Sequence, residues 1–206
     1  LFNLADIYFA SGDVNGAAQL YSHVINNYPK SPVYPYAIYK VGWCYYNTTD
    51  YQGALNQFIK VIDLQNALSK RQRKKNRLGL KKEAQRDLVR VYVNIERATA
   101  TGGLKLIKKY APKRFDELAE RLADLYSGTG QFGKSTTVLR KLIAKKPSSY
   151  RVVGYQIRIS ENISNTHSPE EAIRSLKRLV TLWNSVKNAP DADPKRVRED
   201  HKGIER

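Results

Sequence analysis

The amino-acid sequence predicts an all-α protein, an α-solenoid of about five helix pairs. Apolar residues recur at helical spacing along most of the chain, and no alternation of strands with helices is visible. A segment at residues 4–8, LADIY, recurs almost unchanged at residues 122–126 as LADLY. Short polar or glycine-containing segments separate the apolar stretches. Together these observations predict repeated pairs of short helices joined by tight turns.

The first helix pair opens with residues 4–8, and Gly12 and Asp13 are typical residues for its turn. One face of its second helix is expected to carry Ala17, Tyr21 and Val24. This spacing places the three side chains on a single apolar stripe. Pro29 then ends the second helix, because proline cannot continue it.

The second pair, within residues 36–62, has the clearest pattern, with the polar residues 47–50 between its two helices. The two apolar stripes are Val41, Gly42 and Tyr45 in the first helix and Ala54, Phe58 and Val61 in the second. Neither helix can bury its stripe alone, so each pair must pack against its neighbours.

The spacing of these residues resembles the tetratricopeptide repeat (TPR). In that family, small residues let the two helices of a pair touch, and large residues fill the space between pairs. The resemblance covers roughly residues 1–187 and implies a right-handed solenoid. It is strongest in the first, second and fourth repeats.

The later pairs follow the same pattern less regularly. The third pair begins near Glu83, and its second helix, near residues 102–110, aligns poorly with the repeat. The fourth pair restores the pattern with residues 122–126 and a turn at Gly130. In the fifth pair, residues 168–171 (SPEE) favour a helix start, since they supply a cap, an early proline and acids at the positive end of the helix dipole.

We therefore divide the chain into four parts. Residues 1–68 hold repeats one and two, residues 69–82 form a basic connector, and residues 83–187 hold repeats three to five. Residues 188–206 are polar and charged, which predicts a frayed tail or a solubilising end helix. An alternative is that this tail docks in the groove of a second copy, which would produce self-association.

Positive charge is concentrated in the middle of the chain. The formal net charge is +17, and residues 69–114 hold 16 Lys or Arg against three acids. The basic patch consists of Lys70, Arg71, Arg73, Lys74, Lys75, Arg77, Lys81 and Lys82. It is interpreted as a solvated connector, as a contact for an acidic protein, or as a site for nucleic acid or anionic lipid. No aromatic residue is interleaved with the charges, as single-strand binding would require.

Catalytic and metal chemistry is not indicated. Residues 128–135 fit the phosphate-binding pattern GxxxxGK[ST], but helical residues precede them where that site needs a strand. The histidines His23, His167 and His201 are too far apart in sequence to form a metal pair. The single Cys44 has no disulfide partner and is expected to be buried. We expect no catalytic residue, no metal, no cofactor and no small-molecule substrate.

The TPR resemblance implies a concave groove, lined by the first helix of each pair, that holds a peptide or a helix of a partner protein. The groove positions carried over from the family are Phe2, Asp6, Phe9, Tyr36, Tyr39, Trp43, Tyr46, Arg86, Arg90, Asn94, Glu117, Glu120 and Asp124. The implied function is a non-catalytic scaffold for protein–protein interaction, with a surface that runs from aromatic through basic to acidic. The alternative for each aromatic is that it packs between repeats.

The proline-rich connector at residues 28–35 (YPKSPVYP) lengthens the repeat step from the usual 34 or so to 37 residues between Ala17 and Ala54. It resembles bacterial cell-envelope TPR proteins, such as the lipoprotein of the outer-membrane assembly machine and the periplasmic partner of the Tol–Pal system. Residues 28–51 also resemble envelope TPR proteins of predatory and gliding bacteria that serve gliding motility and type IV pili. The resemblance implies that the protein is located in the periplasm or cell envelope.

No signal sequence is visible, and no apolar run approaches the roughly 20 residues of a membrane-spanning helix. The chain begins at Leu1 and contains no Met, so we expect a fragment or a processed form.

Overall fold

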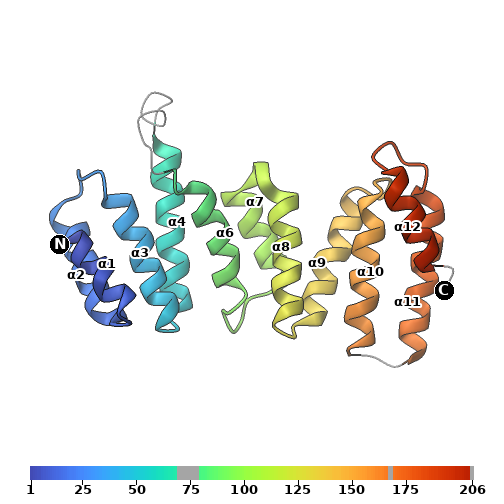
Figure 1. The fold of residues 1–206 in the computed structure, drawn as a ribbon, viewed down its shortest axis with the longest axis horizontal. Coiled ribbons are helices and arrows are strands. Elements are labelled where there is room, and N and C mark those ends of the chain that lie inside the picture. Colours follow the sequence, from blue (N-terminus) through green and yellow to red (C-terminus); the bar gives the residue numbers. More distant parts are fainter. Residues whose placement is uncertain (69–78, 167–168, 205–206) are drawn as a thin grey trace. The chain divides into compact units, whose positions relative to one another are not determined.

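The computed structural model of the chain describes residues 1–68, 79–166 and 169–204. Within these ranges the structure consists of eleven α-helices and one short 3-10 helix, with no strand (Figure 1). Five successive helix pairs are followed by one further helix, which confirms the predicted all-α fold of about five pairs. The chain forms two compact units, residues 1–98 with 105–114 (unit 1) and residues 99–104 with 115–206 (unit 2).

Unit 1 is a row of helices in which neighbours in the chain run antiparallel (Figure 1). Its elements are α1 (Phe2–Ala10), α2 (Val14–Asn27), α3 (Tyr34–Asn47), α4 (Tyr51–Ala67), α6 (Lys81–Tyr92), the second half of α7 (Ala100–Tyr110) and the 3-10 helix η1 (Pro112–Arg114). Each of the first four helices packs against the next, and α4 packs against α6.

The turns inside the first two pairs have the same geometry. Gly12 and Thr49 both adopt positive φ angles, of 88° and 64°, at the point where the chain reverses. The next residues, Asp13 and Asp50, each accept a hydrogen bond of 2.8 Å from the amide three residues later. Such aspartate caps satisfy an amide that the helix leaves without an intrahelical partner, so they fix where α2 and α4 begin.

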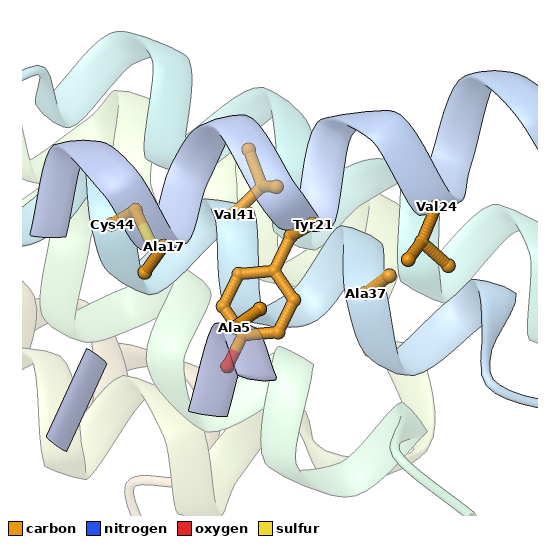
Figure 2. Close-up of a cluster of buried hydrophobic side chains, with 7 residues drawn as sticks. All are labelled: Ala5, Ala17, Tyr21, Val24, Ala37, Val41 and Cys44. Atoms are coloured by element: carbon orange, nitrogen blue, oxygen red, sulfur yellow. The ribbon is translucent and has the colours of Figure 1, made fainter. Parts of the chain in front are cut away.

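The core of unit 1 is built from the predicted stripes. One cluster joins α1, α2 and α3 through Ala5, Ala17, Tyr21, Val24, Ala37, Val41 and Cys44. Figure 2 shows Tyr21 at the centre of this cluster, surrounded by small side chains that let the helices approach closely. Its hydroxyl donates to Asp6 at 2.5 Å, so the one polar group of this ring has a partner.

Unit 2 has the same construction. It holds the first half of α7, then α8 (Phe115–Gly128), α9 (Phe132–Lys145), α10 (Arg151–Ser164), α11 (Pro169–Val186) and α12 (Pro194–Ile204). Helix α8 packs on α9, α9 on α10, and α10 on α11. A small polar network lies inside it, with Ser127, Ser135 and Asn162 within 3.0 Å of one another.

The charged residues near the C-terminus form helix α12. Asp193 caps it by accepting from the amide of Lys195 at 2.8 Å. Tyr150, the N-cap residue of α10, donates to Asp200 at 2.7 Å, and the ring of Trp183 lies 4.9 Å from that of His201. The sequence predicted either a frayed tail or an end helix for this segment. The structure has an end helix, which contacts α10 and α11.

Candidate partner-binding surface

Five of the predicted groove residues form a continuous row of aromatic rings on unit 1. The ring of Phe2 lies 5.3 Å from that of Tyr36, and Tyr36 lies 6.3 Å from Tyr39. Tyr39 lies 6.4 Å from Trp43, which lies 5.3 Å from Tyr46. We call Phe2, Tyr36, Tyr39, Trp43 and Tyr46 the aromatic row. All five side chains are partly exposed.

The sequence of α3 produces this row directly. Tyr36, Tyr39, Trp43 and Tyr46 are spaced three, four and three residues apart, so they share one face of the helix. A second face carries Val41 and the other buried residues that pack on α2. Helix α3 therefore has a core stripe and, beside it, an aromatic stripe.

Phe58 of α4 supports the row from behind. Its side chain is 0% exposed, and its ring lies 5.4 Å from Tyr39 and 5.8 Å from Trp43. Tyr39 is further held by a 2.5 Å hydrogen bond that its hydroxyl donates to Asp87 of α6. Burial and this hydrogen bond raise the pKa of Tyr39 far above its ordinary value, so the hydroxyl stays protonated. The aromatic side chains thus both pack between helices and remain accessible.

Two cations border the row. The ammonium of Lys40 lies 5.2 Å from the centre of the Phe9 ring, 5.5 Å from the Tyr36 ring and 3.0 Å from the carboxylate of Asp6. The guanidinium of Arg90 lies 5.7 Å from the centre of the Trp43 ring, within range of a cation–π interaction. The predicted groove residues Asp6, Phe9 and Arg90 therefore join the same surface.

Lys40 and Phe58 also contact the aromatic row, but they are not among the groove positions predicted from the sequence. Lys40 follows Tyr36 by one helical turn, a spacing that could have placed it on the row. The sequence places Phe58 on the core stripe of its helix. Its contact with the aromatic row depends on how α4 packs on α3, and the spacing of residues along one helix does not predict that packing.

The remaining predicted residues of the third repeat lie along α6 and just after it. Arg86 is exposed and lies 3.9 Å from Glu83, one turn earlier. The side-chain amide of Asn94 donates to the backbone carbonyl of Arg90 at 3.0 Å. Asn94 thus satisfies a backbone carbonyl in the last turn of α6. Of the two predicted groove cations on this helix, Arg90 is the one that lies beside an aromatic ring.

The predicted acidic residues lie on α8 in unit 2, where α10 supplies their partners. Glu120 accepts from the hydroxyl of Tyr155 at 2.6 Å and pairs with Arg151 at 2.8 Å. Asp124 pairs with Arg158. Glu117 is exposed on the same helix.

Glu120 and Asp124 of α8 are therefore paired with a matching face of α10, and the groove prediction did not include that face. Arg151, Tyr155 and Arg158 follow one another at steps of four and three residues, which is a detectable helical stripe.

Comparison with known proteins identifies the repeat. Residues 1–31 and 36–64 match the tetratricopeptide repeat model. These residues comprise α1 and α2 and most of α3 and α4. The first two helix pairs thus match the TPR repeat model.

Several solved structures are similar to the chain as a whole, at low identity. A kinesin light chain with nearly identical TPR-like repeats from Podosopora anserina is 16% identical, with 88% of this chain and 92% of that chain covered and a TM-score of 0.48. MamA from Desulfovibrio magneticus is 18% identical, with coverages of 89% and 93% and a TM-score of 0.46. A TPR protein from Thermus thermophilus is 15% identical, with coverages of 98% and 96% and a TM-score of 0.38. The search of curated proteins returned no match.

The phosphate-loop pattern at residues 128–135 lies in the hairpin between α8 and α9. Lys134 donates to the side chain of Gln131 at 2.8 Å, and its ammonium lies 5.5 Å from the centre of the Tyr126 ring. Gly130 has a positive φ of 73° in this turn, and Gly12 likewise has a positive φ, of 88°, in the turn between α1 and α2. The pattern is thus accounted for by a helical hairpin.

Residues 1–68, 79–166 and 169–204 hold no group of three or more His, Cys, Asp or Glu that could bind a metal ion. None of the helices in these ranges is long and apolar enough to cross a membrane. Cys44 is buried, and burial raises its pKa to about 11, so its thiol is protonated at neutral pH. His167 lies outside the described residues.

The predicted basic patch is described only at its end. Lys81 and Lys82 are the first two residues of α6. The other predicted members lie outside the described residues, namely Lys70, Arg71, Arg73, Lys74, Lys75 and Arg77.

Proposed function

We propose that the chain is a non-catalytic scaffold that binds a peptide or helix of a partner protein on the aromatic row of unit 1. TPR repeats generally mediate protein–protein interaction, and two of them carry this row. The observation that supports the proposal is the row itself: five partly exposed rings in unbroken contact, bordered by Lys40 and Arg90.

The energetics of binding favour such a surface. Aromatic and arginine side chains dominate the binding energy of protein interfaces. Phe58 and the Tyr39–Asp87 hydrogen bond hold the rings in place, so little conformational entropy is lost when a partner binds.

The charges indicate what the partner should carry. Lys40 already pairs with Asp6, whereas the Arg90 guanidinium is exposed above Trp43. A partner with apolar anchors and one acidic group near Arg90 would fit this arrangement.

The test uses Trp43 as its own reporter. With Trp183→Phe, Trp43 is the single tryptophan of the chain, so its fluorescence reports on the row. Peptides selected by display against the purified protein should be rich in apolar and acidic residues and should change this fluorescence on binding. Tyr36→Ala/Tyr46→Ala should weaken binding by about tenfold or more.

The matched control is Tyr8→Ala/Tyr28→Ala, which removes two exposed tyrosines outside the row. Its affinity should equal that of the parent within about twofold. Equal loss in both variants, or no loss in the row variant, would show that peptides bind elsewhere.

We further propose that the scaffold works in the periplasm or cell envelope, in an assembly of the gliding-motility or pilus type. The support is the likeness of residues 28–51 to envelope TPR proteins. Recovery of the native protein only in the cytosolic fraction would overturn this assignment.

Two further proposals concern other partners. Nucleic-acid or anionic-lipid binding through residues 70–90 is the alternative function, and duplex DNA or anionic vesicles captured at moderate salt would support it. Self-association through the C-terminal residues is tested by sedimentation with and without residues 188–206. Loss of a dimer on truncation would support it.

A further inference from the structure

A concave surface lies on unit 1 where the end of α4, the start of α6 and the α7–η1 junction meet. It encloses a pocket of about 390 Å³. Its basic lining residues are Lys81, Lys82, Lys109, Lys113 and Arg114, and we call it the basic pocket. Lys81 and Arg90 are nine residues apart on α6, which places them on opposite sides of the helix. The basic pocket is therefore separate from the aromatic row.

Among the residues that the structure describes, no acidic side chain lines this pocket. Lys81 donates to Asn66, a neutral partner, at 2.5 Å. Among the described residues, no carboxylate pairs with Lys82, Lys109 or Lys113. By contrast, the cations bordering the α8–α10 surface are matched by carboxylates. The charges of Lys82, Lys109 and Lys113 are thus left for a ligand to neutralise.

The position of two of these lysines is unfavourable for the helix itself. Lys81 and Lys82 occupy the first turn of α6, where the helix dipole already contributes positive potential. The acid of that turn, Glu83, is not part of the lining. The dipole and the lysines together strengthen the attraction of the pocket for an anion.

The walls of the pocket are fixed before any ligand binds. The side-chain amide of Gln85 donates to the backbone carbonyl of Tyr110 at 2.8 Å. Arg114 donates to the carbonyl of Lys82 at 3.0 Å and to the side-chain oxygen of Gln85 at 3.2 Å. These bonds tie η1 and the end of α7 to the start of α6, so the cations are held around a preformed hollow.

The lining also contains an apolar part, made of Ala111, Pro112 and the ring of Tyr110. A nucleic-acid backbone consists of charged phosphates and hydrophilic sugars, and it has no apolar side chain that could cover this wall. Stacking of bases is also disfavoured, because the ammonium of Lys109 already lies 5.0 Å from the centre of the Tyr110 ring. A peptide with an apolar side chain between acidic residues matches both parts of the lining.

We infer that the basic pocket binds an acidic segment of a protein, in which an apolar side chain is flanked by closely spaced Asp or Glu. The segment places its apolar side chain against Ala111 and Pro112 and its carboxylates among the lysines. The chain then carries two separate binding surfaces on unit 1, one aromatic and one basic.

The test measures binding of a short fluorescein-labelled peptide, with leucine between aspartate and glutamate residues, by fluorescence anisotropy at moderate salt. Lys109→Glu/Lys113→Glu should weaken binding by about tenfold or more, because both exposed lysines line the pocket. Lys105→Glu/Lys108→Glu makes the same change of charge at exposed positions of α7 outside the pocket and should change affinity by less than about twofold. Circular dichroism melts of both variants check that they fold.

Two further peptides test the chemistry. Replacing aspartate and glutamate with asparagine and glutamine should abolish binding, and replacing leucine with serine should weaken it by about fivefold. The row variant Tyr36→Ala/Tyr46→Ala should bind the acidic peptide with the same affinity as the parent, because the two surfaces are separate. The basic pocket can therefore be confirmed even if the aromatic row proves not to bind a partner.

Three results would overturn the inference. The first is no binding of the acidic peptide, and the second is equal loss in both lysine variants, which would indicate attraction by net charge alone. The third is tighter binding of duplex DNA or phosphatidylserine vesicles that is lost in Lys109→Glu/Lys113→Glu, which would assign the pocket to nucleic acid or lipid.

Discussion

The hydroxyl of Tyr39 on α3 donates a 2.5 Å hydrogen bond to the carboxylate of Asp87 on α6, 48 residues away. This bond ties the second helix pair to the third beneath the aromatic row. The same kind of contact between a tyrosine and a carboxylate of another helix recurs at Tyr21–Asp6, Tyr150–Asp200 and Tyr155–Glu120. Because a hydrogen bond to a charged group is stronger than one between neutral groups, these contacts hold the helices in register.

The first prediction concerns this tie. Tyr39→Phe should lower the free energy of unfolding of unit 1 by about 2 kcal/mol, since it removes the hydroxyl from a carboxylate that is only 8% exposed. Urea unfolding followed by Trp43 fluorescence, in the Trp183→Phe background, measures the change. The control is Tyr8→Phe, at a side chain that is 39% exposed, where we expect a change within about 0.5 kcal/mol. Equal stability of the parent and Tyr39→Phe would mean that the bond contributes nothing.

The second prediction concerns the close approach of α3 and α4. A methyl group at Gly42 would lie 2.9 Å from an edge carbon of the buried Phe58 ring and 3.2 Å from Cβ of Gln57. Gly42→Ala should therefore destabilise unit 1 by about 1–2 kcal/mol through overpacking, although alanine is the better helix former. Thermal unfolding followed by circular dichroism measures this.

Gly133→Ala is the matched control, because Gly133 is also helical and a Cβ there would have no neighbour within 4 Å. It should raise stability by about 0.5–1 kcal/mol. If Gly42→Ala stabilised the protein to the same extent, the two helices would not require the small residue.

The third prediction concerns the turn of the second repeat. Thr49 has a φ of 64° at the position where the first and fourth pairs have glycine. A β-branched residue is strained in this conformation, at a cost of about 1–3 kcal/mol, and glycine is not. Thr49→Gly should therefore raise the free energy of unfolding by about 0.5–1 kcal/mol after the greater chain entropy of glycine is subtracted.

Thr48→Gly provides the comparison for this turn. Thr48 has a negative φ, of −92°, and its hydroxyl lies 3.1 Å from the carbonyl of Cys44. Its replacement should destabilise the protein, so melting temperatures of the two variants should move in opposite directions. A fall in both would show that Thr49 is not strained.

The sequence predicted the helix pairs because their apolar stripes depend only on local spacing. All five residues of the aromatic row were among the groove positions that the TPR resemblance predicted, and the spacing of Tyr36, Tyr39, Trp43 and Tyr46 puts four of them on one face of one helix. The sequence could not show that Glu120 and Asp124 are paired, because this depends on which face of α10 packs against α8. Nor could it show the basic pocket, which joins residues at the ends of α4, α6 and α7 that are far apart in the chain.

The last prediction concerns pH and unit 2. Tyr150, the N-cap residue of α10, is 3% exposed, and burial, together with the hydrogen bond to Asp200, raises its pKa to about 12 from an ordinary value of about 10. The folded state therefore holds this proton more tightly than the unfolded state does. The stability that the protonated hydroxyl supplies is fully present below about pH 10 and is lost as the pH rises toward about 12.

Tyr150→Phe removes both the hydrogen bond and the titrating group. The variant should be less stable than the parent by about 1–2 kcal/mol at pH 8, and this difference should shrink between about pH 10 and 12. Urea unfolding followed by Trp183 fluorescence in a Trp43→Phe background measures it in unit 2. A parent-minus-variant difference that stays constant up to pH 12 would show that Tyr150 titrates with the same pKa in the folded and unfolded chain.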